Sequence, residues 1–396
     1  MTLEVNLTVK CNIACQYCYQ QPMRDSLNVS RDYDLKNVLE ALNKETSEFT
    51  IFGGEPLLTS IDDLEVLFKL GYERFKKNGI QSNGILITPR HIELFKLYNV
   101  HVGLSIDGPD ELNGARCNEK LTQKVQENIK LLSESKVKWS VIITLSRQNG
   151  AIAKREKFKT WISSLINQGC SSIRLHLLED DGDINHLKLS NNELIELLSD
   201  IESLGISKID LFQEIRDRVR GNSKAGSCVF QGCDPYTTPA VQSIGGDGIK
   251  YNCGRVNKEG VDFIKGDTHR YDRSLVLYNT PIEHGGCAGC RFFNVCNGYC
   301  PGTAIDKDWR NRTEFCSVLL HFYNKYEREL LLEGGNVVKA KSPTINYTNQ
   351  SHGDAHGDKL HGDSSKTILT VPVIGRGGEN NMGLQESERI LETNPR

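Results

Sequence analysis

Three cysteines near the start of the chain constrain its fold more than any other feature. Cys11, Cys15 and Cys18 are spaced C-x3-C-x2-C directly after the first apolar run. Three thiols on one short loop suit three irons of a [4Fe–4S] cluster, and without a fourth cysteine nearby one iron stays open for another ligand. The alternatives are a zinc knuckle or three buried thiols with no special role. Zinc prefers four ligands, and the nearest histidine, His91, is far along the chain.

With Tyr17 before the last cysteine, this loop resembles the signature of the radical SAM enzymes. Gly53-Gly54-Glu55-Pro56 and Ser105-Ile106-Asp107-Gly108-Pro109, each after an apolar run, extend the match. By itself, a Gly-Gly pair at a strand end is an ordinary tight turn. In that family S-adenosylmethionine chelates the open iron, and one electron from the cluster releases a 5′-deoxyadenosyl radical. The resemblance implies that the cofactor is bound by Tyr17, Gly53, Gly54, Glu55, Asn83 and Ser105, with Glu55 on its ammonium group.

Residues 1–180 alternate β-rich runs with amphipathic helical runs, which predicts an α/β fold with a parallel sheet. The expected strands are Glu4–Val9, Glu48–Phe52, Gly84–Ile87, Val100–Ile106, Lys138–Leu145 and Ser172–Leu178. The expected helices are Leu35–Lys44, Leu64–Lys77, His91–Tyr98, Thr122–Ser135 and Glu156–Asn167. Periodicity leaves open whether the sheet closes. The family resemblance implies a partial (β/α)6 TIM-like barrel, with its chemistry at the carboxyl ends of the strands.

Eight more cysteines follow residue 227, enough for two closed [4Fe–4S] clusters. From Cys287 to Cys316 the spacing resembles the SPASM domain that follows the barrel in radical SAM peptide maturases. The resemblance, which covers roughly residues 1–325, assigns the first auxiliary cluster to Cys228, Cys233, Cys253 and Cys300. It assigns the second to Cys287, Cys290, Cys296 and Cys316. Two zinc sites are the alternative, although zinc ribbons usually bring two C-x2-C knuckles and only one is present. Between the cysteines, Val241–Tyr251 reads as a β-hairpin.

Other polar residues are candidates for catalysis or binding. Asp107, Arg116, Asp234 and Asp247 are the catalytic candidates, with Arg116 equally suited to a surface ion pair with Asp110 or Glu111. Arg174 and His176 share one face of an expected strand, so they either reach the substrate or are buried and satisfied. Cys117 and Cys170 lie outside every cysteine motif, and each suits a small core or surface position.

Composition excludes several classes of protein. The net charge of −3 favours neither nucleic acid nor an anionic membrane as partner. No apolar run approaches the roughly 20 residues of a membrane span, and the amino-terminal residues lack a secretion signal. Of the thirteen cysteines, eleven are grouped as metal ligands rather than as disulfides, which indicates a reducing cytoplasm.

The resemblance implies oxidative modification of a small, ribosomally made peptide, such as a thioether or carbon–carbon link, with a flavodoxin- or ferredoxin-like reductant. Because the chain enters the barrel almost at once, a separate leader-binding protein is one option. An anaerobic sulfatase maturase is the nearest alternative. In that family an aspartate follows the third ligand of the first auxiliary cluster, whereas Gly254 follows Cys253 here. A radical SAM dehydrogenase of a small molecule and an iron–sulfur electron carrier are further alternatives.

The chain is predicted to divide into a barrel at residues 1–220, a SPASM domain at 221–333 and a polar tail at 334–396. The connector at 220–227 is rich in small polar residues. The tail carries His-Gly-Asp three times between Ser351 and Asp363. A flexible tail, a metal-binding tract and a substrate-like segment fused in cis are the three interpretations. The run Thr367–Ile374 suits an edge strand.

Overall fold

The computed structural model describes residues 2–20, 33–179, 184–222, 226–235, 240–256 and 272–335. These residues belong to one compact unit, Met1–Ile345. The His-Gly-Asp repeats and Thr367–Ile374 lie outside the described residues. No helix among the described residues is long and apolar enough to cross a membrane.

One sheet of eight strands organises the described residues. Its order is β6-β5-β4-β3-β2-β1-β7-β8, and all neighbours are parallel except the antiparallel pair β7–β8. The strands are β1 Thr2–Asn6, β2 Phe49–Phe52, β3 Asn78–Ser82, β4 Val100–Ser105, β5 Trp139–Leu145, β6 Ile173–Leu177, β7 Val241–Gly245 and β8 Lys250–Asn252. In the described part of the chain, β5 is the one named strand that pairs with β6. The curved sheet therefore does not close into a full barrel. The predicted partial barrel is therefore confirmed.

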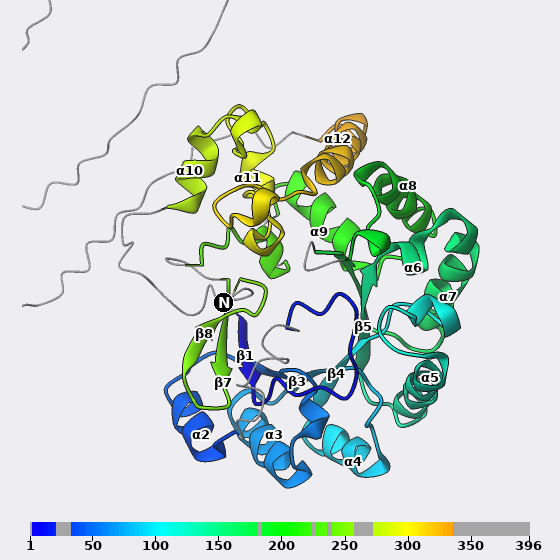
Figure 1. The fold of residues 1–396 in the computed structure, drawn as a ribbon, viewed down its shortest axis with the longest axis vertical. Helices are drawn as coiled ribbons and strands as arrows, with labels where there is room; N and C mark the ends of the chain where they lie inside the picture. Colours follow the sequence, from blue (N-terminus) through cyan, green and yellow to red (C-terminus); the bar gives the residue numbers. More distant parts are fainter. Residues whose placement is uncertain are drawn as a thin grey trace, which may run out of the picture. The chain divides into compact units, whose positions relative to one another are not determined.

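Helices cover much of the outer face of the curved sheet, and further helices, α10 and α11 among them, lie beyond it (Figure 1). They are α2 Leu35–Asn43, α3 Ile61–Phe75, α4 Pro89–Leu97, α5 Glu119–Glu134, α6 Arg147–Gly150, α7 Arg155–Asn167, α8 Asn191–Glu202, α9 Asp210–Val219, α10 Arg273–Asn279, α11 Phe293–Cys296 and α12 Cys316–Leu332. Polar side chains fix several amino-terminal ends. Thr88 and Ser190, for example, each accept from the backbone three residues on in a capping box.

The third strand differs from its prediction. Gly84–Ile87 lies after β3 in a turn, and the strand itself is Asn78–Ser82. The segment Asn-Gly-Ile-Gln-Ser carries one apolar side chain, Ile80, so it has neither the alternation nor the β propensity that marks the other strands. Its two parallel neighbours, β2 and β4, supply the pairing that its own side chains do not favour.

The strands separate an apolar outer layer from a polar inner one. In β1, Leu3 and Val5 are buried beneath the helices, while Glu4 and Asn6 between them point to the concave side and keep partial exposure. The same alternation runs through β6, where Arg174 and His176 face inward. Since successive side chains point to opposite faces, the barrel interior is lined mostly by polar groups.

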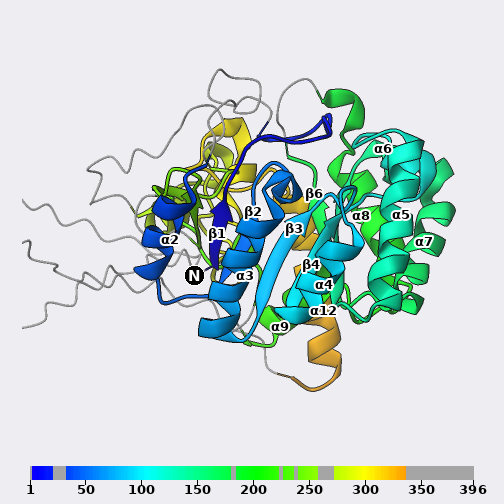
Figure 2. The same ribbon diagram turned by 90° about the horizontal axis from the view of Figure 1, so that it is seen from below.

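The predicted hairpin is confirmed as β7 and β8, and it has an additional role. β7 pairs in parallel with β1 over Thr2–Asn6, so the cysteine-rich segment extends the barrel sheet itself. α12 then packs against α8 and α9. Figure 2 shows the strands side-on, with the loop that follows β1 lying at their carboxyl ends. The predicted domain boundary at residue 220 stays a prediction.

Candidate functional site

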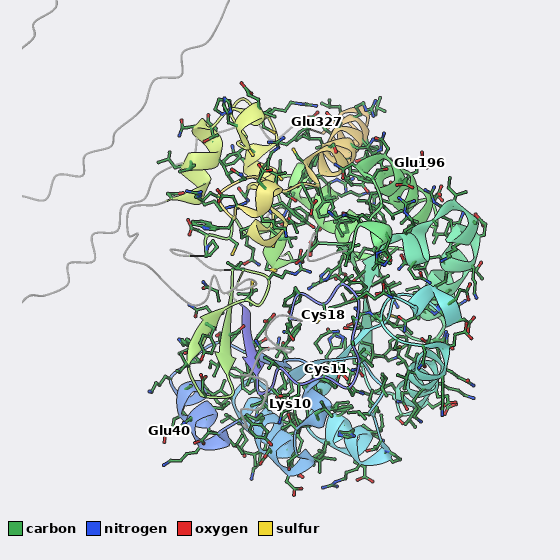
Figure 3. All side chains as sticks on the ribbon, viewed as in Figure 1. Lys10, Cys11, Cys18, Glu40, Glu196 and Glu327 are labelled. Carbon is green, nitrogen blue, oxygen red and sulfur yellow. The ribbon has the colours of Figure 1, made fainter. Side chains whose placement is uncertain are left out.

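The cysteine loop after β1 lies within the curve of the sheet, where Figure 3 labels Cys11 and Cys18. Its ends are fixed by backbone hydrogen bonds. The amide of Gly54 donates to the carbonyl of Thr8 (2.7 Å), and that of Glu55 to Lys10 (2.8 Å). Farther along, the amide of Gln16 donates to the carbonyl of Ala115 (2.8 Å). The Gly-Gly-Glu turn thus holds the segment that leads into Cys11.

The three thiols of this loop lie close enough to influence one another. Burial, with smaller contributions from the nearby Cys18 and Cys11 thiols and against the lowering effect of Arg116, raises the pKa of Cys15 to about 12. Burial also raises the pKa of Cys11, with the Cys18 thiol contributing. Thiols that share a partly buried loop suit a group that binds them as thiolates.

The glycines of the turn are required by this close crossing. A Cβ on Gly53, whose φ is +142°, would lie 2.5 Å from the carbonyl oxygen of Thr8. A Cβ on Gly54 would lie 2.2 Å from the carbonyl oxygen of Lys10 and 2.5 Å from that of Val9. Both distances are far inside van der Waals contact, so only glycine permits the two backbones to meet.

Glu55 is fully buried, and three groups donate to its carboxylate. Oε1 accepts from the Ser82 hydroxyl (2.7 Å) and the Leu57 amide (3.0 Å), and Oε2 accepts from the Asn83 amide (2.7 Å). Burial raises the pKa of Glu55 in spite of these bonds. The carboxylate therefore ties the Gly-Gly-Glu turn to the end of β3. A contact with a cofactor ammonium group stays a prediction.

Asn83 and Ser105 sit at the ends of neighbouring strands. The Asn83 side chain donates to Asn12 Oδ1 (2.7 Å) and lies 3.9 Å from Cys11 Sγ. Ser105 Oγ accepts from the side-chain amide of Gln81 (2.8 Å). Asn83 thus reaches the cysteine loop itself, while Ser105 faces the interior one strand farther on.

Asp107 joins Tyr17 and Arg116 in a buried cluster. Its Oδ1 lies 3.1 Å from Arg116 Nε and accepts from the Thr144 amide (2.8 Å), and its Oδ2 accepts from the Tyr17 hydroxyl. A second guanidinium nitrogen, Nη1, lies 3.9 Å from Cys15 Sγ. Arg116 is therefore held against the cysteine loop.

The alternative for Arg116, a surface ion pair with Asp110 or Glu111, is not found among the contacts of the described residues. Asp110 and Glu111 pair with Lys157 instead, at 3.0 Å and 2.6 Å. Of the other acidic candidates, Asp234 is buried and accepts from the Arg273 amide (2.9 Å). Asp247 is exposed in the β7–β8 turn, where it accepts from Ile249.

The structure gathers the first predicted auxiliary set around Cys300. Burial, with a contribution from the Cys300 thiol, raises the pKa of Cys228 and of Cys233 to about 11. Burial likewise raises the pKa of Cys253, with Cys300 and Cys233 both contributing. Four thiols from a 73-residue stretch of sequence thus lie within electrostatic reach of one another.

The second predicted set lines one small pocket. Its walls include Cys287, Cys290, Cys296 and Cys316 together with the aromatic rings of Phe292, Phe293 and Tyr323. All thirteen cysteines of the chain are free thiols, as the metal-ligand interpretation requires. The donor sets therefore fit two four-thiolate groups.

No group of three or more His, Cys, Asp or Glu side chains in the described ranges converges on a single ion position. Tetrahedral zinc requires such convergence. An iron–sulfur cluster does not, because each cysteine binds a different iron. The choice of iron–sulfur clusters over zinc stays a prediction. Cys117 and Cys170 stay apart from all three sets. Cys170 is buried in the hydrophobic core.

Several polar side chains form a cluster in the barrel interior, and the sequence analysis identified only one of them, His176. Arg255 Nε pairs with Glu179 Oε1 (2.7 Å), and its Nη2 lies 2.9 Å from His176 Nδ1. Glu4 on β1 and Tyr19 complete the group, since both influence the same guanidinium. Burial and the charge of Arg255 lower the pKa of His176 well below its usual range. The available signal was a charged residue, Glu4, between Leu3 and Val5 in a central strand.

Residues 5–152 match the model of the radical SAM superfamily. Among curated proteins, the serine-type anaerobic sulfatase-maturating enzyme of Bacteroides thetaiotaomicron is 30% identical over 156 residues, which cover 35% of this chain and 38% of that protein. The cysteine-type enzyme of Clostridium perfringens is 28% identical over 34% of this chain and 41% of its own length. The chain thus spans about two fifths of these relatives.

The match is longer to the radical SAM cyclopropyl synthase TigE of Paramaledivibacter caminithermalis. It is 22% identical over 342 residues, covering 78% of this chain and 69% of that protein. Solved structures share the fold. AdoMet-bound anSMEcpe superposes with a TM-score of 0.61 at 18% identity over 84% of this chain and 98% of that one. Streptococcus suis SuiB bound to S-adenosylmethionine gives 0.54 at 18% identity over 80% and 76%.

Proposed function

Because residues 5–152 match the model of the radical SAM superfamily, we propose that the chain reductively cleaves S-adenosylmethionine and oxidatively modifies a ribosomally made peptide. One observation carries the proposal. Three mutually close thiols lie on a loop inside the barrel, and the Gly-Gly-Glu turn and Arg116 hold that loop.

The cofactors of the proposed reaction are S-adenosylmethionine and a [4Fe–4S] cluster held by Cys11, Cys15 and Cys18. When bound, they supply a 5′-deoxyadenosyl radical that abstracts a hydrogen atom. The chain's own residues position that chemistry. Asn83 lies against the loop beside Cys11, and Arg116 lies beside Cys15 with its guanidinium fixed by Asp107.

Two auxiliary clusters are the finer part of the proposal. Cys228, Cys233, Cys253 and Cys300 are proposed to hold one, and Cys287, Cys290, Cys296 and Cys316 the other. Burial raises the pKa of Cys233 in the first set and of Cys287 in the second, which favours a bound metal group, because an uncompensated thiolate in such surroundings is costly. The clusters would accept the electron that a net oxidation releases.

A peptide is the proposed substrate. Structures that share the fold hold peptides, namely anSMEcpe with AdoMet and the Cp18Cys peptide, and SuiB with the precursor peptide SuiA. The polar barrel interior, with Glu4, Arg255 and His176, suits a substrate that presents hydrogen-bonding groups.

The proposal also includes a flavodoxin- or ferredoxin-like reductant, a separate leader-binding protein and a cytoplasmic location. The thirteen free thiols favour that location.

Sulfatase maturation is the second candidate, because several curated relatives carry that name. One contact counts against it. Gly254 follows Cys253 where sulfatase maturases are expected to carry an aspartate, and a Cβ on Gly254 would lie 2.5 Å from the Tyr19 ring. A carboxylate at this position would displace Tyr19.

The proposal is tested by anaerobic reconstitution, reduction and incubation with S-adenosylmethionine and the short peptides encoded beside the gene. We expect one of these peptides to lose two hydrogen atoms by mass, with tandem spectra locating the change. A cysteine- or serine-containing sulfatase peptide serves as the competitor. Its conversion to formylglycine, with no change in the neighbouring peptides, would favour sulfatase maturation.

A further inference from the structure

The space beside the first auxiliary set is occupied by an aromatic ring rather than by an acid. Tyr19 Cε2 lies 2.5 Å, and its hydroxyl oxygen 3.3 Å, from the position of a Cβ on Gly254. Any side chain at residue 254 would meet this ring. Residue 254 therefore supplies no side chain that could accept the proton released in a net oxidation.

Glu4 is a carboxylate on the concave face of β1. It stands opposite Ser243 in the β1–β7 register, and the Ser243 hydroxyl donates to its Oε2 at 3.3 Å. Its Oε1 accepts no hydrogen bond from the described residues, and the side chain keeps partial exposure to the interior. One carboxylate oxygen thus stays available to a molecule in the barrel.

The groups around Glu4 come from several elements. Tyr19 follows the cysteine loop, Arg255 follows β8, and the thiols of Cys228 and Cys253 belong to the first auxiliary set. Glu4 therefore lies within electrostatic reach of both the segment that carries the cysteine triad and the auxiliary thiols.

The neighbouring charged groups are already engaged. The Arg255 guanidinium pairs with Glu179 at 2.7 Å and lies 2.9 Å from His176, so these two side chains already hold it. Among the sequence candidates, Asp107 is bound by Arg116 and the Thr144 amide, and Asp247 lies exposed in a hairpin turn. Glu4, by contrast, keeps one carboxylate oxygen that accepts no hydrogen bond from the described residues.

We propose that Glu4 accepts the proton that the substrate loses in the proposed oxidation. The inference rests on the proposed function. Two substrate bonds to hydrogen break and one new bond forms. One hydrogen atom goes to the 5′-deoxyadenosyl radical and one proton goes to Glu4. The remaining electron reduces the oxidised iron–sulfur cluster assigned to Cys228, Cys233, Cys253 and Cys300, so atoms and electrons balance.

The protonation equilibrium of Glu4 suits this role. Burial raises its pKa to about 7, against the lowering effects of the Ser243 hydrogen bond and the Arg255 charge. A general base works best when its pKa lies near the working pH, and removing one typically costs 10²–10⁴-fold in rate. A carboxylate at its ordinary pKa would be a weaker acceptor.

The test compares reconstituted wild type, Glu4→Gln and Glu4→Asp with a peptide that the wild type modifies. In Glu4→Gln we expect unchanged iron content and visible spectrum. Formation of 5′-deoxyadenosine and deuterium transfer from substrate should stay within twofold, whereas product formation should fall about 100-fold or more. Glu4→Asp should restore part of the product. Glu40→Gln, on the exposed face of α2, is the matched control.

A pH profile gives an independent readout. The rate of product formation by the wild type should increase as the pH rises through about 7. The residual rate of Glu4→Gln should not show this increase. The inference would be overturned if Glu4→Gln formed product at the wild-type rate. Loss of iron or of 5′-deoxyadenosine formation in that variant would also overturn it, because the role of Glu4 would then be structural. A wild type that leaves S-adenosylmethionine intact contradicts the proposed function instead, so the two failures are distinguishable.

Discussion

At the scale of single residues, the site depends on buried polar groups whose bonds are already made. Asp107 holds Arg116 beside Cys15, and Glu55 holds the turn that leads into Cys11. Each carboxylate is nearly inaccessible to solvent, so removing a partner leaves a charge or a donor unsatisfied. These residues are best tested first by stability and only then by activity.

Replacing Asp107 by Asn should destabilise the protein by about 3 kcal/mol, because it leaves the Arg116 guanidinium buried without its counter-charge. Arg116→Met with Asp107→Asn should cost less than the sum of the two single changes. Urea unfolding of the four proteins gives this coupling. Additive losses would mean that the pair does not act as one unit.

Gly54→Ala should destabilise the protein by about 1–3 kcal/mol and impair loading of the loop cluster, because the new methyl group meets two backbone oxygens. Gly205→Ala is the matched control, since nothing lies within 4 Å of its Cβ position and only the cost of its φ of +65° applies. Thermal unfolding and iron content measure both. If the two changes had equal effects, Gly54 would not be required by the close approach of the two backbone segments.

At the scale of elements, helices were predictable where apolar periodicity and end signals agreed. The expected run Leu35–Lys44 became α2 Leu35–Asn43, and the expected run Glu156–Asn167 became α7 Arg155–Asn167. β3 was not predictable, because its sequence is polar and its pairing comes from β2 and β4. The addition of β7 to β1 joins segments about 240 residues apart, which no local pattern records.

Ser190→Ala should destabilise the protein by about 1 kcal/mol, since its hydroxyl accepts from the Glu193 amide at the start of α8. Ser199→Ala, within the same helix, lacks any capping role and should change stability by a few tenths of a kcal/mol. Chemical denaturation midpoints of the two variants check the difference. A larger loss at residue 199 would contradict the assigned cap.

At the scale of the whole molecule, the cysteines were predictable because their spacing is visible in the sequence. The interior acid–base group was not, because Glu4, Glu179 and Arg255 come from distant segments and meet only in the fold. Glu55 shows a related limit. Its motif predicts a cofactor contact, whereas its geometry adds a structural role at the end of β3.

The raised pKa of Glu4 makes stability depend on pH. The native state holds this proton up to about pH 7, whereas the unfolded chain releases it near 4.5. The native state therefore binds more protons between these values, and its stability falls as pH rises through this window, by at most about 3 kcal/mol. Glu4→Gln should lack this fall. Urea unfolding at pH 5, 6, 7 and 8 compares the two, and parallel curves would contradict the assigned pKa.

The central claim is that the loop thiols hold a cluster with an iron open to S-adenosylmethionine. The most direct measurement is chromatographic detection of 5′-deoxyadenosine after anaerobic reconstitution and chemical reduction, in wild type and in Cys18→Ala. We expect 5′-deoxyadenosine and methionine in equal amounts from the wild type and neither from Cys18→Ala. Intact S-adenosylmethionine in an iron-loaded, reduced wild type would contradict the account.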